Sequence, residues 1–223
     1  MLEFIYGTMG AGKSLRLIDT YKSCKRDING HINILTLRYK LHDNDEGIIK
    51  SRNGDEITCR LFDGATNFEE LFFYEQWSQK YDLILIDEIQ FCSETQINDL
   101  YRISCSVDVY CYGLLLDQTG RLFEASKRLI EVSDFSIMLH SNCSVCLSSA
   151  TTDAMYIKRK DGSWERDKGS HYCIPKPPSK TLQYVPMCRC CFELSKYDVI
   201  SNADLKVYLN LKRLSYKYKE EKK

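Results

Sequence analysis

A short run near the N-terminus has residue types and spacing suited to holding a chain of phosphates: Gly7-Thr8-Met9-Gly10-Ala11-Gly12-Lys13-Ser14. Gly7 and Gly12 are expected to let the backbone curl so that successive N–H groups point at phosphate oxygens. Lys13 can reach the β and γ phosphates, and the Ser14 hydroxyl is suited to coordinate Mg2+ at the start of the following helix. The run therefore predicts a site for a nucleoside triphosphate, with ATP as the expected cofactor.

Two carboxylates form a second chemical centre. Asp87 and Glu88 directly follow the apolar run at residues 83–86, and ligands of open α/β sheets bind at the carboxyl ends of the strands. An acidic residue in this place in a phosphate-loop protein typically holds Mg2+, directly or through water, which suits Asp87. Glu88 is then available to accept a proton from an attacking hydroxyl or to position a water. The pair predicts phosphoryl transfer and leaves kinase and hydrolase open.

Cysteines provide a third group of candidate ligands. The chain has 11 cysteines, and two pairs have the C-x-x-C spacing that lets two thiolates face one tetrahedral ion. On spacing alone we expect a structural zinc site with no open position, formed by Cys143, Cys146, Cys188 and Cys191. Cys190 and Cys173 are spare thiols nearby, and a thioredoxin-like redox pair is disfavoured because neither pair follows a recognisable βαβ unit. The cysteines earlier in the chain are expected to behave as small apolar residues.

Composition indicates a compact intracellular protein. Lys plus Arg and Asp plus Glu each total 31 of 223 residues, so the formal charge gives no argument for a nucleic acid polymer or a membrane as partner. No apolar run approaches the roughly 18 residues that span a bilayer. The N-terminus lacks the regions of a secretory signal, so a cytoplasmic location is expected.

The elements that must position these residues follow from hydrophobic periodicity. Strands are predicted at Leu2–Tyr6, Ile32–Leu35, Leu83–Ile86 and Val107–Tyr112. Helices are predicted between them, at Ser14–Cys24, Phe68–Gln79 and Ser93–Ile103. This alternation is typical of an α/β protein of the P-loop NTPase type, with a mostly parallel sheet flanked by helices.

The chain is expected to divide into three parts. Residues 1–140 are predicted to form the nucleotide-binding α/β domain, residues 141–195 a small zinc-binding subdomain, and residues 196–223 a helix or tail. Residues 147–187 lack a long periodic helix and are expected to form a hairpin and an extended loop held by zinc. The polar stretch at 38–59 is a loop or hairpin that either reaches over a ligand or is simply a solvated face, and both readings stay open.

The ordered motifs resemble the thymidine kinases of the cellular and bacterial type. The resemblance rests on the phosphate loop with Met9 at its third position, the box at 87–91 (Asp-Glu-Ile-Gln-Phe), the segment 111–114 followed by Asp117 and Phe123, and the two cysteine pairs. It spans roughly residues 2–195. In that family a zinc-bound subdomain carries a lasso loop that closes over the nucleoside, and Tyr184 matches the lasso tyrosine.

The resemblance implies transfer of the ATP γ-phosphate to the 5′-hydroxyl of thymidine. Glu88 matches the general base, Asp87 the acid of the magnesium site, and Lys13 would stabilise the transferring charge. Residues that would line the nucleoside pocket are Met9, Leu114, Gln118, Phe123 and Tyr184. Family members are commonly homotetramers, so a homotetramer is expected by resemblance only.

Two departures bear on the nucleoside side of the site. The family usually has an aromatic residue at the position of Gln118, and a Gly-Gly pair where this chain has Pro177-Pro178-Ser179-Lys180. These departures leave open which base is preferred. They also motivate an alternative from another class, a diverged kinase-like protein that binds ATP and has a regulatory or assembly role.

Overall fold

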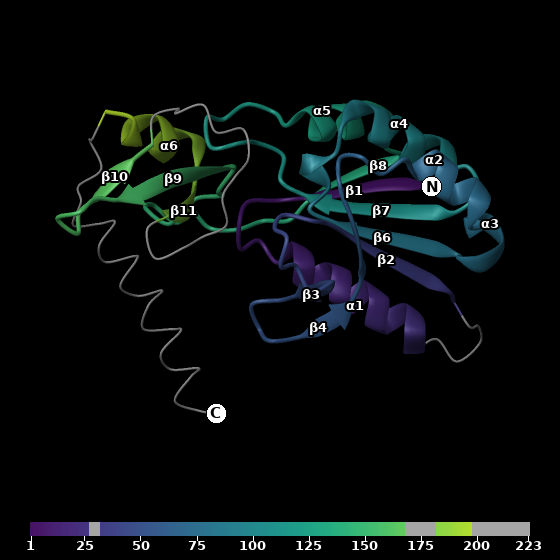
Figure 1. Cartoon of the computed structure of the whole chain (residues 1–223). Helices are drawn as coiled ribbons and strands as arrows, with labels where there is room; N and C mark the ends of the chain where they lie inside the picture. Colours follow the sequence, from purple (N-terminus) through teal and green to yellow (C-terminus); the bar gives the residue numbers. More distant parts are fainter. Residues whose placement is uncertain (27–31, 168–181, 198–223) are drawn as a thin grey trace. The chain divides into compact units, whose positions relative to one another are not determined.

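The computed structural model describes residues 1–26, 32–167 and 182–197, and these form two compact units. The first unit comprises residues 1–116 and 121–139, and the second comprises residues 117–120 and those from 140 onward. Figure 1 shows the elements of both. In the described residues no helix has the length and apolar character needed to cross a membrane. The predictions for residues 198–223, for Cys173 and for Pro177-Pro178 concern positions outside the described residues.

The first unit is built on a parallel sheet of six strands in the order β5-β2-β6-β7-β1-β8. The strands are β1 (Leu2–Tyr6), β2 (Ile34–Tyr39), β5 (Arg60–Phe62), β6 (Leu83–Asp87), β7 (Asp108–Gly113) and β8 (Phe135–Met138). Every neighbouring pair runs parallel, so the carboxyl ends of all six strands lie at one edge. Because β1 and β6 flank β7 in this order, the residues that follow them meet at that edge. The mostly parallel sheet predicted from the sequence is confirmed.

The side chains of β6 show why the sheet needs cover on both faces. Leu83 and Leu85 pack into the core that contains Leu17 of the first helix, whereas Ile84 and Ile86 pack into the core on the opposite face. Successive side chains of a strand point to opposite faces of the sheet, so an unbroken apolar run needs a core on each face. The first unit accordingly has a helical layer on each side of its sheet (Figure 1).

One face is covered by helix α1 (Lys13–Arg26) and by a short antiparallel hairpin of β3 (Ile48–Lys50) and β4 (Glu56–Thr58). The hairpin settles the secondary structure of the polar stretch at 38–59. The other face is covered by α2 (Phe68–Tyr74), α3 (Trp77–Lys80), the short 3-10 helix η1 (Ile89–Phe91), α4 (Glu94–Ile103) and α5 (Glu124–Val132). Trp77 is fully buried in this second core.

The single helix predicted for Phe68–Gln79 is wrong. The chain leaves the helix after Tyr74, and Gln76 takes a left-handed conformation with φ 54° before α3 begins. The break lets Trp77 enter the core while its ring nitrogen donates a hydrogen bond to Glu75. Burial of one large aromatic side chain therefore outweighs the helical continuity that the sequence favours.

The second unit contains a three-stranded antiparallel sheet in the order β10-β9-β11, followed by a short helix. Its elements are β9 (Thr152–Lys158), β10 (Trp164–Arg166), β11 (Leu182–Met187) and α6 (Arg189–Ser195). Its core includes Tyr156, Val185 and Phe192, and Trp164 packs against it. The hairpin expected between residues 147 and 187 is present as β9 and β10.

The cysteines within the described residues form no disulfide. Cys92 and Cys111 lie in the first unit's core, and burial raises the pKa of both thiols, so they are protonated apolar groups as expected. Cys24 and Cys59 are half-buried. Cys105 is exposed, which differs from that expectation because it lies in the turn after α4 rather than inside the helix.

Candidate nucleotide site and cysteine cluster

The glycine-rich loop between β1 and α1 uses its glycines in two different ways. Gly10 and Gly12 have φ values of 84° and 91°, a region that other L-residues rarely adopt. Gly7 does not have a positive φ, so the role given to it in curling the backbone is corrected. A Cβ at Gly7 would lie 2.7 Å from the Leu139 carbonyl oxygen and 2.8 Å from the Ala11 Cβ, so this glycine is required by close packing.

Lys13 and Ser14 lie at the start of α1 and point back toward the loop and the sheet edge. The Lys13 ammonium donates hydrogen bonds of 3.0 Å to the carbonyl oxygens of Gly7 and Thr8. The Ser14 hydroxyl donates to Asp87 Oδ2 over 3.1 Å. The structure thus brings together the hydroxyl and the carboxylate that the sequence predicted for a magnesium site, although they are 73 residues apart.

Asp87 is 4% exposed at the end of β6. Burial and the neighbouring Glu88 carboxylate raise its pKa to about 7, while Lys13 and the hydrogen bonds from Ser14 and the Glu88 amide act in the opposite direction. A buried carboxylate with an unfavourable desolvation is suited to a divalent cation, because the cation replaces the lost hydration. Two hard oxygen donors 3.1 Å apart are ligands that Mg2+ accepts.

Glu88 has a left-handed backbone with φ 60° and ψ 35°. A non-glycine residue in this region is strained, and such strain is maintained when the surroundings fix it. Here Asp87 Oδ1 accepts a hydrogen bond from the Glu88 amide over 3.0 Å. The Glu88 carboxylate in turn accepts one from the Gln90 side-chain amide over 2.6 Å. The carboxylate is therefore held in one orientation at the strand end.

Gln90 is a site residue whose contacts the sequence analysis missed. Its side-chain nitrogen donates to Glu88, and its side-chain oxygen accepts from the Leu114 amide over 3.0 Å. The Leu114 carbonyl accepts a 2.6 Å hydrogen bond from the buried Ser126 hydroxyl. Both main-chain groups of Leu114 are thus fixed, one of them directly to the residue that orients Glu88. Phe123 starts α5, and its ring packs against Phe91 with a centroid distance of 6.0 Å.

A cavity of about 340 Å³ opens beside the loop. Its lining includes Met9, Lys13, Ser14 and Glu88, four of the residues named from the sequence. The tip of the β3–β4 hairpin supplies the remaining side, with Lys50, Ser51, Arg52 and Asn53. A cavity of this size matches a small-molecule ligand. The hairpin therefore lines this cavity, which favours the reading in which residues 38–59 reach over a ligand.

Two of the expected pocket residues, Gln118 and Tyr184, belong to the second unit. Gln118 is buried in the turn at 117–120, and its carbonyl oxygen accepts a hydrogen bond from Arg166. Tyr184 lies in β11 and is 6% exposed. Burial and the carboxylates of Asp153 and Asp167 raise the pKa of its hydroxyl, which has no hydrogen-bond partner among the described residues.

Four cysteine sulfurs converge in the second unit. The Sγ atoms of Cys143, Cys146, Cys188 and Cys191 all lie within 4.8 Å of one another. The Cys146 and Cys188 sulfurs are 3.5 Å apart. Zinc at about 2.3 Å from four tetrahedral thiolates requires sulfur separations of about 3.8 Å. The four-cysteine cluster can therefore hold zinc, and Cys190 and the described cysteines of the first unit stand outside it.

Local backbone geometry holds each cysteine pair. After Cys146 the chain turns through Leu147, which has φ 64° and donates its amide to the Cys143 carbonyl over 3.0 Å. Cys188 precedes α6, and its sulfur accepts from the Cys191 amide. A thiolate that accepts backbone N–H groups is the usual arrangement of a zinc knuckle.

A glycine-rich loop between a parallel strand and a helix, with its serine bonded to an aspartate two strands away, defines the phosphate-loop class of α/β proteins. Within that class the relationship is closer. The chain belongs to the thymidine kinase family, because a family model described as "Thymidine kinase" matches residues 1–192.

Individual relatives agree with the family. A thymidine kinase of Encephalitozoon cuniculi is 31% identical over 161 residues, which cover 71% of this chain and 74% of the relative. A thymidine kinase of Zymomonas mobilis is 32% identical over 155 residues, covering 67% of this chain and 77% of the relative. That of Haemophilus influenzae is 36% identical over 142 residues, covering 60% and 69%.

Proposed function

We propose that this protein is a thymidine kinase that transfers the γ-phosphate of ATP to the 5′-hydroxyl of thymidine. Membership of the family supports this activity. The observation that carries the proposal is that Lys13, Ser14 and Glu88 line one cavity, while Asp87 at the same strand end is hydrogen-bonded to Ser14. These side chains provide a cation, two magnesium ligands and a base, which are the groups that phosphoryl transfer requires.

The loop at 7–14 is proposed to bind the ATP phosphates. Its amides form the anion site, and Lys13 exchanges its hydrogen bonds with loop carbonyls for bonds to the β and γ phosphates. Ser14 and Asp87 would hold Mg2+, which neutralises charge that develops on the phosphate oxygens. Leu15 and Arg52 line the same cavity, so the nucleotide is enclosed from more than one element.

Glu88 is proposed as the general base. Its carboxylate accepts the proton of the 5′-hydroxyl as the new O5′–P bond forms, and the bond between the γ-phosphorus and the bridging oxygen breaks to release ADP. The hydrogen bond from Gln90 orients the carboxylate and places no positive charge beside it. The strained backbone of Glu88 has its functional reason in this placement.

The nucleoside is proposed to lie against Met9, Leu114, Gln118, Phe123 and Tyr184. The geometry supports this for Leu114, whose main chain is tied through Gln90 to the proposed base. The amide side chain of Gln118 replaces an apolar ring, so the base would meet a hydrogen-bonding group where the family has an aromatic wall. Pocket polarity of this kind changes which base is accepted.

Zinc in the cysteine cluster is proposed to be structural. Four thiolates leave no open coordination position, so the ion would stabilise the second unit and supply no chemistry. We assign nucleotide binding to residues 1–140 and zinc binding with the lasso to residues 141–195. A homotetramer is the expected form, supported by the resemblance alone, and the cytoplasm is the location expected from the sequence composition.

The test is a panel assay with ATP, Mg2+ and each deoxynucleoside, following formation of the 5′-monophosphate. Product with thymidine is expected, and product with another base alone would replace thymidine as the substrate. No product with any nucleoside, under conditions where ATP still binds, would favour the diverged ATP-binding protein with a regulatory or assembly role. The Glu88→Gln variant serves as the inactive control for contaminating kinases.

A further inference from the structure

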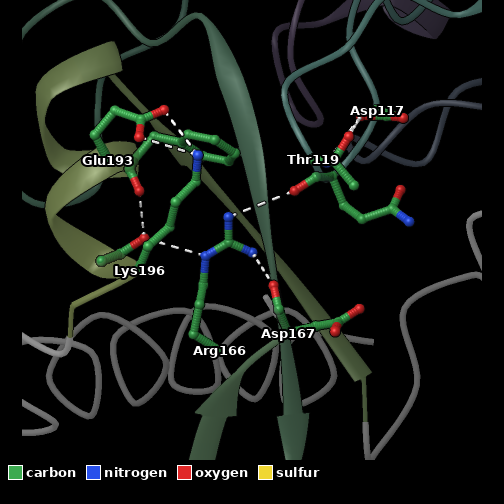
Figure 2. Close-up of polar contacts among 9 residues, drawn as sticks. Asp117, Thr119, Arg166, Asp167, Glu193 and Lys196 are labelled. Carbon is green, nitrogen blue, oxygen red and sulfur yellow. Dashed lines mark hydrogen bonds and ion pairs between the residues drawn. The ribbon is translucent and has the colours of Figure 1, made fainter. Parts of the chain in front are cut away.

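Arg166 ends β10 and is 4% exposed, although charged side chains are rarely buried. Its guanidinium donates four hydrogen bonds to oxygens from different parts of the second unit, and Figure 2 draws the one to Asp167. The acceptors are the Ser195 hydroxyl at 3.1 Å and the carbonyls of Asp167 at 2.8 Å, Met155 at 3.3 Å and Gln118 at 3.4 Å. The side chain thus joins α6, β9, the end of β10 and the turn at 117–120.

The acceptors are neutral, which distinguishes this site from a salt bridge. Among the described residues no carboxylate oxygen accepts a hydrogen bond from Arg166, and burial lowers the pKa of its guanidinium. A buried cation is costly unless its donors are satisfied. Here the Phe192 ring stacks on the guanidinium at 4.7 Å and contributes a cation–π interaction. A guanidinium that is buried among neutral acceptors is suited to holding the segments that carry those acceptors in place.

The turn at 117–120 is rigid by its own hydrogen bonds and by its packing. Asp117 Oδ1 accepts from the amide and the hydroxyl of Thr119, at 2.8 and 2.7 Å (Figure 2). Gly120 has φ 86°, and a Cβ there would lie 3.3 Å from the Phe192 ring. Arg166 therefore holds the turn through the Gln118 carbonyl, and the Phe192 ring lies near enough to Gly120 to crowd any larger side chain there.

Arg166 and Phe192 also connect the turn to the cysteine cluster, through helix α6. Phe192 and Ser195 belong to α6, the helix that Cys188 begins and that contains Cys191. Ser195 donates to the Phe192 carbonyl over 2.7 Å while its oxygen accepts from Arg166. On the outer side of the helix, Lys196 pairs with Glu193 and lies 4.9 Å from the Phe192 ring (Figure 2).

The turn is also continuous in sequence with the carboxyl edge of the parallel sheet. Leu114 follows β7 and is bonded to Gln90, and Leu116 pairs with Leu122 through an isolated antiparallel bridge. The turn is therefore the tip of a short hairpin whose base belongs to the first unit. Any group that fixes this tip also fixes the peptide of Gln118.

We propose that Arg166 is a positioning residue for nucleoside binding, which fixes the Gln118 main chain and links it through α6 to the four-cysteine cluster. This inference rests on the proposed function, because it takes Gln118 as part of the nucleoside pocket. It assigns Arg166 no contact with ATP or with the reacting atoms. Loss of the guanidinium should weaken nucleoside binding and leave nucleotide binding intact.

The test compares three variants of the full, zinc-loaded chain. Arg166→Met keeps the length of the side chain but removes every donor, and the KM for the nucleoside should rise about 10-fold or more while the KM for ATP stays within about 2-fold. Arg166→Lys keeps the charge but cannot reach all four acceptors, so it should give a smaller rise. Arg159→Met is the matched control, since Arg159 lies on the same β9–β10 hairpin and pairs with Glu165 at the surface.

Two results would overturn the proposal. One is an unchanged nucleoside KM in Arg166→Met that retains its zinc. If that variant loses zinc, Ser195→Ala decides, because it keeps the guanidinium and removes only the Ser195 hydroxyl, which accepts from Arg166 Nε and donates to the Phe192 carbonyl. Ser195→Ala with zinc retained should still raise the nucleoside KM, and an unchanged value is the second overturning result.

Hydrogen exchange separates this inference from the proposed activity. The amides of Thr119 and Gly120 donate within the turn, so they should exchange at least about 10-fold faster in Arg166→Met than in Arg159→Met. Absence of nucleoside turnover in the unmodified protein would contradict the proposed function and not this exchange result. Faster exchange with an unchanged nucleoside KM would contradict the link between Arg166 and the nucleoside.

Discussion

Glu88 combines a strained backbone with a single side-chain orientation. The φ of 60° turns the residue away from the strand, and the amide of Gln90 holds its carboxylate. Positioning and electrostatics supply most of the rate in phosphoryl transfer, so an error in the placement of a base is costly. The residue scale is therefore where the proposed chemistry can be tested most directly.

Glu88→Gln should keep the shape of the site and remove the base. We expect kcat to fall at least about 100-fold, with the dissociation constant for ATP within about 2-fold of the unmodified value. Single-turnover kinetics and calorimetric ATP binding measure the two quantities. Glu94→Gln, at an exposed position in the first turn of α4, is the control and should leave both unchanged. A near-normal kcat in Glu88→Gln would remove Glu88 from the role.

Asp87 gives a prediction about pH and stability. Its pKa is about 7 in the folded chain and about 4 in an unfolded one, so the folded state binds the proton more tightly. The corresponding stability is present below pH 4 and is lost as the pH rises through 7. Without Mg2+ or nucleotide, Asp87→Asn should therefore be more stable than the unmodified protein above pH 7, by about 1 kcal/mol or more.

Urea unfolding at pH 5 and pH 8 measures this difference, which should be larger at pH 8. Asp43→Asn is the control, since the Asp43 side chain is fully exposed and should show no pH-dependent difference. An Asp87→Asn variant that is less stable than the unmodified protein at pH 8 would show that the buried carboxylate is not destabilising. Adding Mg2+ and ATP should reduce or reverse this difference, because the chain with Asp87 holds Mg2+ and is stabilised more.

The site residues that could be predicted from the sequence depend on their neighbours in the chain, whereas those that could not be predicted depend on distant partners. Asp87 and Glu88 could be predicted because the strand that carries them is adjacent in sequence. Gln90 and Arg166 act through partners 24 and 48 residues away, at Leu114 and Gln118. Nothing in the local pattern marks such contacts, because the fold alone brings the two partners together.

At the scale of the element, the turn that follows the first cysteine pair contains a residue with a strained backbone, and a substitution can relieve that strain. Leu147 has φ 64° and is 75% exposed, so its side chain gains little from packing. Leu147→Gly should stabilise the chain by about 1 kcal/mol, because glycine adopts the left-handed region without the Cβ clash. Thermal unfolding of the zinc-loaded protein measures this change.

Val145→Gly is the matched control in the same knuckle. Val145 is exposed but has no positive φ, so glycine there should only add unfolded-state entropy and destabilise the chain by about 0.5–1 kcal/mol. Opposite signs for the two glycine variants support the strain argument. A loss of stability in Leu147→Gly would refute it.

The elements also show where periodicity succeeds and where it fails. The run Leu83–Ile86 could be predicted as a strand because both of its faces are apolar. Strand β8 could not, since it is a mostly exposed edge strand of four residues with no alternation of burial. The break at Gln76 could not either, because glutamine is a good helix former, and only the pocket that receives Trp77 makes the break favourable.

At the scale of the whole molecule, the two units should differ in their response to metal removal. Cys188→Ala should abolish zinc binding, which elemental analysis would show as a fall from about one ion per chain. The second unit should then become sensitive to limited proteolysis, whereas the first unit should still bind ATP. Cys190→Ala is the control, because its exposed thiol lies outside the cluster. Equal zinc content in the two variants would contradict the assignment of Cys188.

The distribution of indole side chains has a practical consequence. The chain contains 2 tryptophans, and each unit has one, Trp77 in the core of the first and Trp164 beside the core of the second. Replacing either by phenylalanine leaves a single intrinsic fluorophore that reports on one unit alone. Emission from Trp77 should shift to the red only when the parallel sheet unfolds, while emission from Trp164 should respond to a chelator, so one spectrometer can follow the two units separately.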